Sequence, residues 1–380
     1  MSVIIVNATA IRSSGALSIL NQFIVNIPSS STELYYIFVN PCFQRISKDN
    51  IIYVNIDTIS WVKRIIWDSF GLRSWINKQN IDVDLIVSFQ NTGVRYNKDI
   101  PQLIYYHQLL PLIDYKWNIF KANERTFFLY KNFYSFFVSC FLNNQTHVVV
   151  QTPCIANAFQ KKIAIDSSRI HVIFPGVNII ATDKIKCIEW NDDCFHFLYP
   201  ATPLIYKNHE VLLKALARIL DNSIELGNKI RYHFTFDKGD YEQIDRFVNK
   251  HGFQDNIVYE GVLSYEQLLS LYKSAHALLF PSYIESLGLP LIEAASFGIP
   301  IITSDLPFAH DVVGSYEGAR FVQYDKPELW EKAIISSCDK KLYTPMLTEI
   351  KHILFICLFW EFFEFSCNKG NTAQRLCGIA

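Results

Sequence analysis

Two glutamates spaced eight positions apart have the residue type and spacing best suited to ligand chemistry in this chain. Glu285 and Glu293 lie in the stretch F-P-S-Y-I-E-S-L-G-L-P-L-I-E-A-A-S-F-G-I-P-I-I-T-S-D, residues 280–305. Pro290 has its φ preset for a first helical turn and Gly298 is a typical C-terminal stop, so a helix is expected between them. Glu293 is therefore expected on that helix, and Glu285 in the loop before it.

The start of this helix is expected to favour an anion. The first N–H groups of a helix have no partner within it, and the helix dipole is positive at that end. The N–H groups around Leu287, Gly288 and Leu289 would therefore suit a phosphate. The stretch suits a polar ligand with a diphosphate in its middle.

A lysine and a histidine are further candidates. Lys207 lies just before an expected amphipathic helix, 210–220, on the side where a bound phosphate would sit. A lone lysine is normally a solvated charge, and that alternative stays open. His107 directly follows an expected strand, and ligands of open α/β sheets gather beyond the carboxyl ends of strands. A histidine satisfied at a sheet edge is the alternative for His107.

Two shorter motifs carry weaker signals. The loop expected at 13–16 contains Ser14 and Gly15 after the first strand, but G-x-G-x-x-G is absent. This loop either approaches a ligand closely or is a plain β–α turn. Asp82-Val83-Asp84 matches a D-x-D pattern that holds a divalent metal in some sugar-nucleotide enzymes. Because it precedes a buried apolar run, capping of a strand is the simpler interpretation.

The elements that must position these residues follow a β–α plan in both halves of the chain. Short apolar runs separated by helical stretches predict parallel strands. The expected strands are 3–6, 34–39, 51–54, 85–89, 102–106, 147–151, 194–199, 230–236, 256–260, 277–280 and 299–303, with helices at 210–220 and 265–274. The predicted fold class is α/β, with two Rossmann-like doubly wound domains.

The periodicity breaks after Pro175-Gly176, which indicates a boundary between domains. The predicted division is an N-terminal domain at 1–178, a linker at 179–193, a C-terminal domain at 194–345 and an atypical apolar tail at 346–380. Two domains also agree with the length of 380 residues, which is long for one core.

Composition excludes some partners and locations. A net charge of −1 does not favour nucleic acid. Nine cysteines without C-x-x-C or ligand-spaced histidines predict buried thiols in a reducing compartment. The N-terminus lacks a basic leader, and no run of about 18 uncharged apolar residues occurs, so a cytoplasmic location is expected.

The segment 112–141 is dense in aromatic residues, with Lys116, Lys121, Arg125 and Lys131 interleaved. A basic, aromatic helical surface suits a bilayer interface, where rings lie at headgroup depth and lysines meet anionic lipid. Aromatic stripes at helical spacing also form cores, so both alternatives stay open.

The motifs of the second half resemble those of a known family. The run from Ile257, I-V-Y-E-G-V-L-S-Y-E-Q-L-L-S-L-Y-K-S-A-H-A-L-L-F-P-S-Y-I-E-S-L-G-L-P-L-I-E-A-A-S-F-G-I-P-I-I-T-S-D, closes with D-V-V-G at Gly314. Its E-x7-E pattern with G-L-P between the glutamates, followed by G-x-P and a strand, resembles the group 1 (family 4) retaining glycosyltransferases of the GT-B fold. Supporting segments are Y-H-Q-L-L-P at Tyr106, V-V-V-Q-T-P at Val148, V-I-F-P-G-V at Val172 and Y-K-N-H-E at Tyr206. The resemblance covers residues 1–335 and is looser in the first half.

The resemblance implies a nucleotide sugar held by the second domain and an acceptor site shaped by the first. Glu285 would contact hydroxyls of the transferred sugar, Lys207 would neutralise the diphosphate and His107 would lie near the donor sugar. The donor-binding positions that it implies are Glu293, Ser286, Leu287, Gly288, Leu289, Gly15, Ser14 and Gly261. Such enzymes generally need no metal, so no metal and no other cofactor is expected.

Physical chemistry agrees with these positions. Ribose hydroxyls donate to a carboxylate, whereas the diphosphate would repel one, so Glu293 belongs at the ribose end. Charge develops on the leaving phosphate, where positioned N–H groups and Lys207 would stabilise it.

The function that follows is transfer of a sugar from a nucleotide-diphosphate donor to a glycan, expected to be lipid-linked, in synthesis of a cell-surface polysaccharide such as O-antigen or capsule. The enzyme would work on the cytoplasmic membrane face as a peripheral protein. A nucleotide-sugar epimerase of the same fold and a non-catalytic nucleotide-sugar-binding subunit are the alternatives. A Rossmann dehydrogenase is disfavoured because the glycine fingerprint is absent.

Two features depart from the family pattern. The arginine often found about five residues before the phosphate lysine is replaced by Thr202. Either another cation substitutes for it, or the phosphate is held more weakly. The tail also lacks the amphipathic helix with which this fold usually returns to its first domain.

Overall fold

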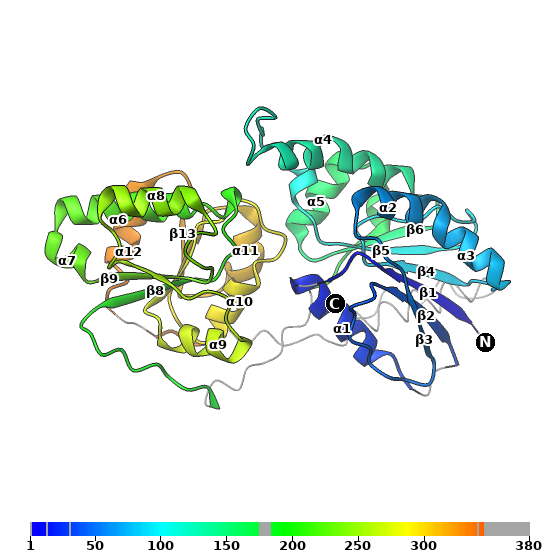
Figure 1. The fold of residues 1–380 in the computed structure, drawn as a ribbon, viewed down its shortest axis with the longest axis horizontal. Helices are drawn as coiled ribbons and strands as arrows, with labels where there is room; N and C mark the ends of the chain where they lie inside the picture. The colour runs from blue at the N-terminus through cyan, green and yellow to red at the C-terminus, as the bar shows by residue number, and fades with distance from the viewer. Residues whose placement is uncertain (1, 13, 30–31, 175–183, 340–341, 346–380) are drawn as a thin grey trace. The chain divides into compact units, whose positions relative to one another are not determined.

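The computed structural model describes the chain except for residues 1, 13, 30–31, 175–183, 340–341 and 346–380. The described residues form two compact units. The first contains 2–114 and 129–174, and the second contains 115–128 and 184–345, with the gaps above. Each unit is built on its own parallel sheet (Figure 1). The predicted α/β fold with two doubly wound domains is confirmed.

The first unit contains a seven-stranded sheet of order β3-β2-β1-β4-β5-β6-β7. All of its pairings are parallel, so the carboxyl ends of the strands share one edge. The strands are β1 Val3–Ala8, β2 Leu34–Val39, β3 Ile51–Asn55, β4 Leu85–Ser88, β5 Gln102–Tyr106, β6 Thr146–Val150 and β7 Ile170–Val172. The central strands are buried on both faces, which is why they read as continuous apolar runs.

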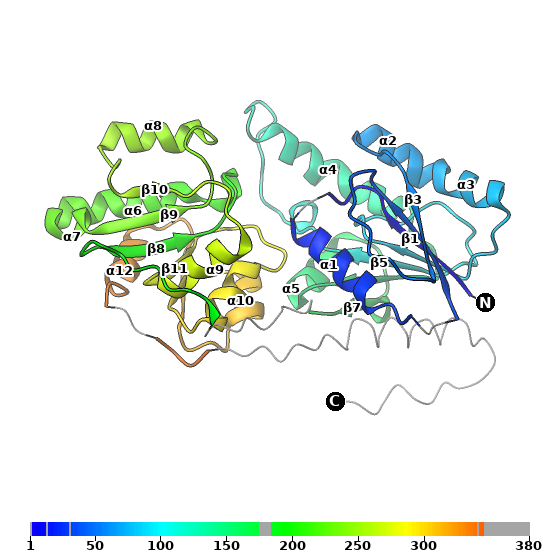
Figure 2. The same cartoon turned by 60° about the horizontal axis from the view of Figure 1, so that its bottom comes forward.

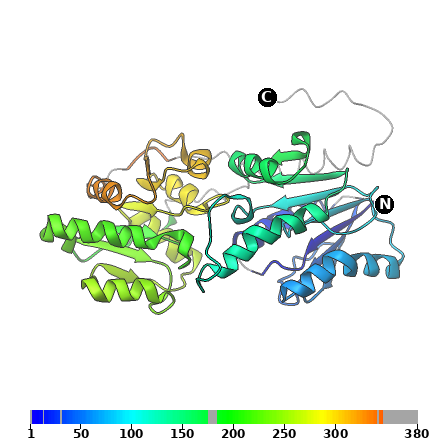
Figure 3. The same ribbon diagram turned by 90° about the horizontal axis from the view of Figure 1, so that it is seen from above.

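The helices of the first unit cover this sheet. They are α1 Ser14–Asn26, α2 Trp61–Ile66, α3 Leu72–Gln79, α4 Arg125–Cys140 and α5 Pro153–Lys162, with short helices at Leu110–Leu112 and Ser167–Arg169. Residues 125–128, at the start of α4, are assigned to the second unit. A π-helical turn, η1 at Trp67–Gly71, joins α2 to α3. The Trp61 and Phe137 rings meet at 4.9 Å between centroids, and α4 lies beside the α2–α3 run (Figures 2 and 3).

The second unit contains a six-stranded parallel sheet of order β10-β9-β8-β11-β12-β13. Its strands are β8 Phe195–Tyr199, β9 Ile230–Phe234, β10 Ile257–Tyr259, β11 Ala277–Phe280, β12 Ile301–Ser304 and β13 Ala319–Val322. Its helices are η5 Ile205–Lys207, α6 His209–Asn222, α7 Ile224–Asn228, α8 Glu242–His251, α9 Tyr265–Ser274, α10 Leu289–Ser296, α11 Pro307–Val313 and α12 Pro327–Ile335. Helices α8 and α12 pack beside α6, whereas α11 packs beside α10.

Residues 115–128 belong to the second unit, although they fall inside the range 1–178 predicted as one domain. The Tyr115 ring stacks on Tyr283 at 5.1 Å, and the Phe127 ring meets Tyr206 edge-on at 5.5 Å. Residues 184–193 of the predicted linker also pack on this unit, where Trp190 stacks on His196 at 3.8 Å. The start of the predicted linker, 179–183, and the predicted tail, 346–380, lie outside the described residues.

Three local expectations need correction. Helix α1 begins at Ser14, so Ser14 and Gly15 lie in its first turn and not in a loop over 13–16. The segment 112–141 is helical only over α4, and the part before Arg125 is largely irregular. The cysteines were predicted to be buried thiols, but none of the six described cysteines is buried, and Cys42, Cys140 and Cys187 are exposed.

Candidate active site

The candidate site of the second unit lies where its sheet changes direction. The chain runs from β8 outward to β9 and β10, then returns to β11 and runs outward to β12 and β13. Strands β8 and β11 are therefore neighbours whose following loops diverge at their carboxyl ends. In an open α/β sheet this switch point is where ligands bind. Lys207 follows β8 and Glu285 follows β11, so the two sequence candidates come from its two sides.

The structure brings Lys207 and Glu285 together in an ion pair between Nζ and Oε1. Their side chains are only 15% and 12% exposed, so solvent screens this pair less than a surface pair. The loops that carry them are fastened to each other, because the Tyr283 N–H donates to the Tyr206 carbonyl over 3.0 Å. Asn208 adds a side-chain hydrogen bond of 3.2 Å to the Pro281 carbonyl. The pair is thus held in a defined position beyond the strand ends.

A buried tyrosine holds the two loops that carry Lys207 and Glu285. The Tyr199 hydroxyl, at the end of β8, donates to the Lys207 carbonyl over 2.5 Å and lies 2.8 Å from the Ser282 hydroxyl. Burial raises the pKa of Tyr199 well above its usual value, so the hydroxyl stays protonated and remains a donor. These contacts link the β8 loop to the β11 loop through a side chain in the core.

The start of α10 follows directly after Glu285. Gly288 is its N-cap residue with φ 74°, a left-handed conformation that glycine adopts without strain. A Cβ atom at this position would meet the Leu291 Cδ1 atom at 3.2 Å. Leu289 opens the helix and Pro290 occupies its first turn, which agrees with the sequence prediction. Backbone N–H groups therefore gather at one place beside the ion pair, as an anion site requires.

Glu293 lies on α10 and is 9% exposed. Its Oε2 atom accepts a 2.8 Å hydrogen bond from the hydroxyl of Tyr272 on α9. Burial raises the pKa of Glu293, and the hydrogen bond from Tyr272 opposes that rise. Helices α9 and α10 lie side by side in both views (Figures 1 and 2), so Tyr272 fixes the orientation of the carboxylate.

Two hydroxyl residues at this edge were not predicted. Thr303 and Ser304 end β12, the strand beside β11, and both are fully buried. Neither hydroxyl has a hydrogen-bond partner among the residues that the structure describes. Buried polar atoms are normally paired, so these two hydroxyls are an exception at this edge of the sheet. The sequence signal was the change from I-I to T-S at the end of an apolar strand.

Gly261 lies elsewhere on this edge. It follows the outer strand β10 and has φ 67°. A Cβ atom here would approach the Asp237 Oδ1 atom to 2.7 Å, so the contacts of Gly261 are with the loop after β9. Its predicted donor-binding role stays a prediction.

Ser14, Gly15 and His107 belong to the first unit. His107 follows β5 as predicted, and its N–H donates to the Asn91 side chain over 2.7 Å. Its Nδ1 atom has no hydrogen-bond partner among the described residues. Burial, together with the charge of Arg64, lowers the pKa of His107 to about 4, so the ring is neutral at pH 7. A neutral imidazole can donate or accept a hydrogen bond but carries no charge.

A buried polar network in the first unit was missed from the sequence. Asp68, in the π-helical turn η1, accepts hydrogen bonds from Asn7 at 2.9 Å and from Thr92 at 3.2 Å. Arg64 lies 3.8 Å from the Asp68 carboxylate. Burial raises the pKa of Asp68 to about 6, while Arg64 and the two hydrogen bonds act in the opposite direction. π-Helical turns often mark functional sites, but no sequence pattern announced this one.

The D-x-D motif lies at the opposite edge of the first sheet. The Asp84 Oδ2 atom accepts a 2.7 Å hydrogen bond from the N–H of Val3 at the start of β1. This contact is a strand cap at the amino ends of the strands. Among the described residues, no group of three or more His, Cys, Asp or Glu side chains could hold a metal ion.

Two family models match consecutive parts of the chain. "Glycosyltransferase Family 4" matches residues 40–180, and "Glycosyl transferases group 1" matches residues 182–347. The chain is 26% identical to the O-antigen chain mannosyltransferase RfbU of Salmonella typhimurium strain LT2 over 208 residues. That match covers 54% of this chain and 55% of the relative, so the chain matches about half the length of that protein.

Solved glycosyltransferases share the fold over nearly the whole chain. A glycosyltransferase from Rickettsia africae ESF-5 aligns with a TM-score of 0.63 and 14% identity, over 97% of this chain and 99% of that one. WaaG, a glycosyltransferase involved in lipopolysaccharide biosynthesis, aligns with a TM-score of 0.64 and 13% identity, over 97% and 100%.

The two Rossmann-like units and their match to solved glycosyltransferases thus define a GT-B fold. The chain belongs to the group 1 (family 4) glycosyltransferases, as its motifs predicted.

Proposed function

We propose that this chain transfers a sugar from a nucleotide-diphosphate donor to a glycan acceptor with retention of anomeric configuration. The observation that carries the proposal is the ion pair of Lys207 and Glu285 across the switch point, immediately before the N-terminus of α10. This arrangement places a cation, a carboxylate and a set of backbone N–H groups within one site. A nucleotide sugar needs these three kinds of partner for its diphosphate and its hydroxyls.

Donor binding divides among these groups by charge. Lys207 and the N–H groups of Ser286, Leu287 and Gly288 would hold the diphosphate. Glu293 would accept from the ribose hydroxyls through Oε1, because Tyr272 already donates to Oε2. Gly261, Leu289, Ser14 and Gly15 would border the donor through their backbone. Binding of the diphosphate requires Lys207 to share its charge between Glu285 and the ligand, and no metal or other cofactor is proposed.

In the transfer step, the bond between the anomeric carbon and the leaving phosphate oxygen breaks. A bond from the acceptor hydroxyl oxygen forms on the same face of the sugar, and the hydroxyl proton passes to the leaving phosphate oxygen. Lys207 and the α10 N–H groups would stabilise the negative charge that develops on that phosphate. Glu285 would hold hydroxyls of the transferred sugar and is not the nucleophile. Neutral His107 would contribute a hydrogen bond to the donor sugar.

The acceptor is proposed to be a lipid-linked glycan of a cell-surface polysaccharide. Support comes from RfbU, which is named as an O-antigen chain mannosyltransferase, and from WaaG, which is involved in lipopolysaccharide biosynthesis. Mannose is accordingly the first donor sugar to test. The enzyme would act at the cytoplasmic face of the membrane.

An exposed apolar surface on the first unit supports peripheral membrane contact. Leu129, Phe133 and Phe136 form a stripe along α4 and are 46%, 53% and 65% exposed. Val62 and Ile66 of the neighbouring α2 are 63% and 56% exposed. Clustered exposed apolar side chains of this kind suit a bilayer interface. Among the described helices, none is both long and apolar enough to cross a bilayer.

The test of this proposal is a transfer assay with a panel of nucleotide sugars and a membrane lipid extract. Nucleoside diphosphate should be released only when donor and acceptor are both present. Release should fall sharply in Glu293→Ala. Normal donor turnover by Glu293→Ala would contradict the site, and turnover without any acceptor would favour an epimerase or a hydrolase.

A further inference from the structure

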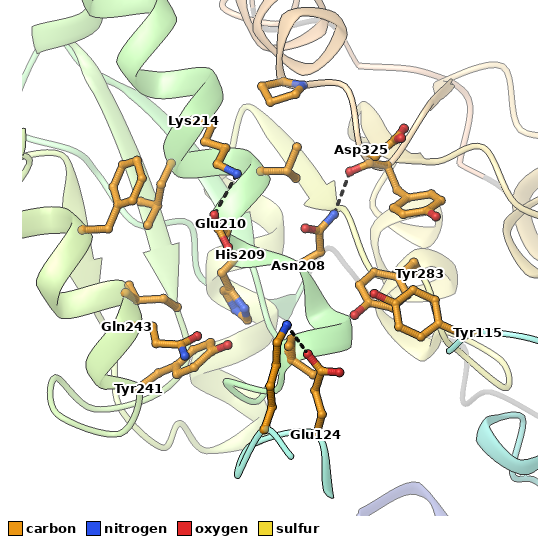
Figure 4. Close-up of a pocket in the computed structure, with 18 residues that line it drawn as sticks. Tyr115, Glu124, Asn208, His209, Glu210, Lys214, Tyr241, Gln243, Tyr283 and Asp325 are labelled. Atoms are coloured by element: carbon orange, nitrogen blue, oxygen red, sulfur yellow. Dashed lines mark hydrogen bonds and ion pairs between the residues drawn. The ribbon is translucent and has the colours of Figure 1, made fainter. Parts of the chain in front are cut away.

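A separate cavity opens in the second unit (Figure 4). Its volume is about 640 Å³, which is large enough for a ligand of several rings. The starts of α6 and α8, the loop between β13 and α12, and part of the segment 115–124 form its walls. Lys207, Glu285 and Glu293 do not line it.

Tyrosine rings supply flat faces to this cavity. Tyr115, Tyr241, Tyr283 and Tyr324 all line it. Tyr115 stacks on Tyr283 with 27° between the ring planes, and the Tyr283 and Tyr324 centroids lie 5.4 Å apart. Burial raises the pKa of Tyr241, and the Glu210 charge adds to the rise, so its hydroxyl is neutral at pH 7. Neutral aromatic rings with hydroxyl tips suit a ligand that has both apolar faces and polar edges.

A buried histidine faces this cavity with both ring nitrogens available. His209 is 1% exposed, and neither of its nitrogens has a hydrogen-bond partner among the described residues. Its ring packs against Tyr199 at 4.5 Å and edge-on against Phe234 and Phe236 at 5.1 and 5.3 Å. Figure 4 shows the imidazole among the lining side chains. Leaving a buried polar group without a hydrogen-bond partner costs free energy. A ligand that forms hydrogen bonds with the His209 nitrogens would remove that cost.

The protonation state of His209 determines which ligand groups can form hydrogen bonds with its ring nitrogens. Burial, together with the charge of Lys207, lowers its pKa to about 3, so the ring is neutral. A neutral imidazole presents one N–H donor and one lone pair. A hydroxyl group both donates and accepts, so sugar hydroxyls match these two nitrogens, whereas a phosphate oxygen only accepts.

The charges of the cavity also disfavour an anion. Its lysines are already paired: Lys121 Nζ lies 3.1 Å from Glu124, and Lys214 Nζ lies 2.7 Å from Glu210. Asp325 adds a third carboxylate to the lining. The five formal charges sum to −1, because two lysines face three carboxylates. Carboxylates accept hydrogen bonds from hydroxyls and repel phosphates.

We propose that this cavity binds a neutral saccharide, at a site distinct from the donor site. Tyrosine faces would contact the sugar rings, and His209, Gln243 and Asp325 would bind hydroxyls. Asn208 follows Lys207 directly and Tyr283 precedes Glu285 by two residues, so a glycan held here would lie next to the transfer site. The inference rests on the proposed function only for the choice of saccharide probes.

The test measures saccharide binding directly, without a nucleotide sugar, by calorimetry or ligand-observed NMR on the full chain. Mannotriose and maltotriose are the probes. Binding should persist in Glu293→Ala and in the presence of saturating UDP and GDP, and should weaken at least tenfold in Tyr241→Ala and in Tyr115→Ala. Phe120→Ala is the matched control, because Phe120 lies in the same segment as Tyr115, is 90% exposed and does not line the cavity.

The outcomes separate this inference from the proposed function. No binding of either probe at millimolar concentration overturns the saccharide site, even if transfer activity is found. Equal binding by Tyr241→Ala and the parent protein, or displacement of the probe by UDP or GDP, also overturns it. His209→Phe removes both nitrogens with a similar ring shape, and should weaken binding while circular dichroism confirms folding. If the protein binds the saccharides but transfers no sugar, the saccharide site stands and only the proposed function is contradicted.

Discussion

Lys207 and Glu285 form an ion pair across the point where the chain of the six-stranded sheet changes direction, although 78 positions separate them in the sequence. The pair needs the neighbouring placement of β8 and β11, which the strand order provides. Each residue therefore holds the other in place. This relationship is the basis of the first prediction.

Lys207→Met should abolish tight binding of nucleoside diphosphates and reduce kcat/KM roughly 100-fold or more, the range seen when a preorganised charge-stabilising group is removed. Steady-state kinetics with the best donor of the panel measures this loss. Lys250→Met is the control, since Lys250 is an exposed lysine in the last turn of α8 of the same unit and does not line the cavity. Equal activity of the two variants would show that Lys207 does not contact the diphosphate.

Gly288→Ala should weaken nucleoside diphosphate binding, because φ 74° is strained for alanine and the α10 N–H groups would shift. Gly252→Ala is a matched control, since Gly252 has φ 73° and open space around it at the end of α8. Both variants should lose about 1 kcal/mol of unfolding free energy. Only Gly288→Ala should lose the thermal stabilisation by nucleoside diphosphate. If the nucleoside diphosphate raised the melting temperature of both variants equally, the anion site at α10 would be refuted.

Tyr272→Phe should raise the pKa of Glu293 further, because it removes the hydrogen bond that opposes the effect of burial. A greater share of Glu293 would then be protonated at a given pH, which weakens its acceptance of ribose hydrogen bonds. The donor KM should therefore begin to rise at a higher pH than in the parent protein when the pH is lowered. A pH profile of the donor KM from 5 to 8 measures this shift. An unchanged profile would place Glu293 away from the ribose.

Acidification should destabilise the protein through two histidines whose pKa values are lowered in the folded state. The folded-state pKa values of His107 and His209 are about 4 and about 3, below the ordinary value of 6.5. Between these values and 6.5 the unfolded chain binds more protons, so the unfolding free energy falls as the pH is lowered through this window. Each histidine contributes up to about 1.4 kcal/mol per pH unit.

Urea unfolding at pH 6.5, 5.5 and 4.5 measures this slope. His209→Gln should make the slope for the second unit shallower, because the amide does not titrate. The same slope in the variant and the parent protein would show that His209 does not remain neutral in the folded state.

Phe133→Ser combined with Phe136→Ser should reduce sedimentation with anionic vesicles at least about tenfold, because two exposed rings would no longer enter the interface. Val25→Ser on α1 is the control, since Val25 is 58% exposed on another helix of the same unit. Vesicles of phosphatidylglycerol and phosphatidylethanolamine provide the measurement. Unchanged sedimentation of the double variant would exclude this surface as the membrane contact.

The sequence predicted those features that depend on local pattern. The strands at 34–39, 102–106 and 277–280 and the helix at 265–274 have the predicted bounds, because each is a clear apolar run or a capped amphipathic segment. Strands β7 and β13 were missed because they are short and only partly buried. The early start of α1 was missed because Ser14 and Gly15 have low helix propensity.

Features that depend on distant contacts were not predictable in this way. Lys207 and Glu285 were each candidates, but their pairing depends on the strand order. The attachment of 115–128 to the second unit depends on ring contacts with Tyr206 and Tyr283. Asp68 and His209 were not among the sequence candidates, because their burial depends on packing against distant segments of the chain.

The central claim is that Lys207 and Glu293 hold a nucleotide-diphosphate donor at the start of α10. Titration calorimetry of the parent protein, Lys207→Met and Glu293→Gln with a panel of nucleoside diphosphates tests it most directly. We predict that one nucleoside diphosphate binds the parent protein and that both variants bind it at least tenfold more weakly. The affinity for inorganic pyrophosphate should fall in Lys207→Met but stay unchanged in Glu293→Gln. Equal affinity of all three proteins for every nucleoside diphosphate would contradict the account.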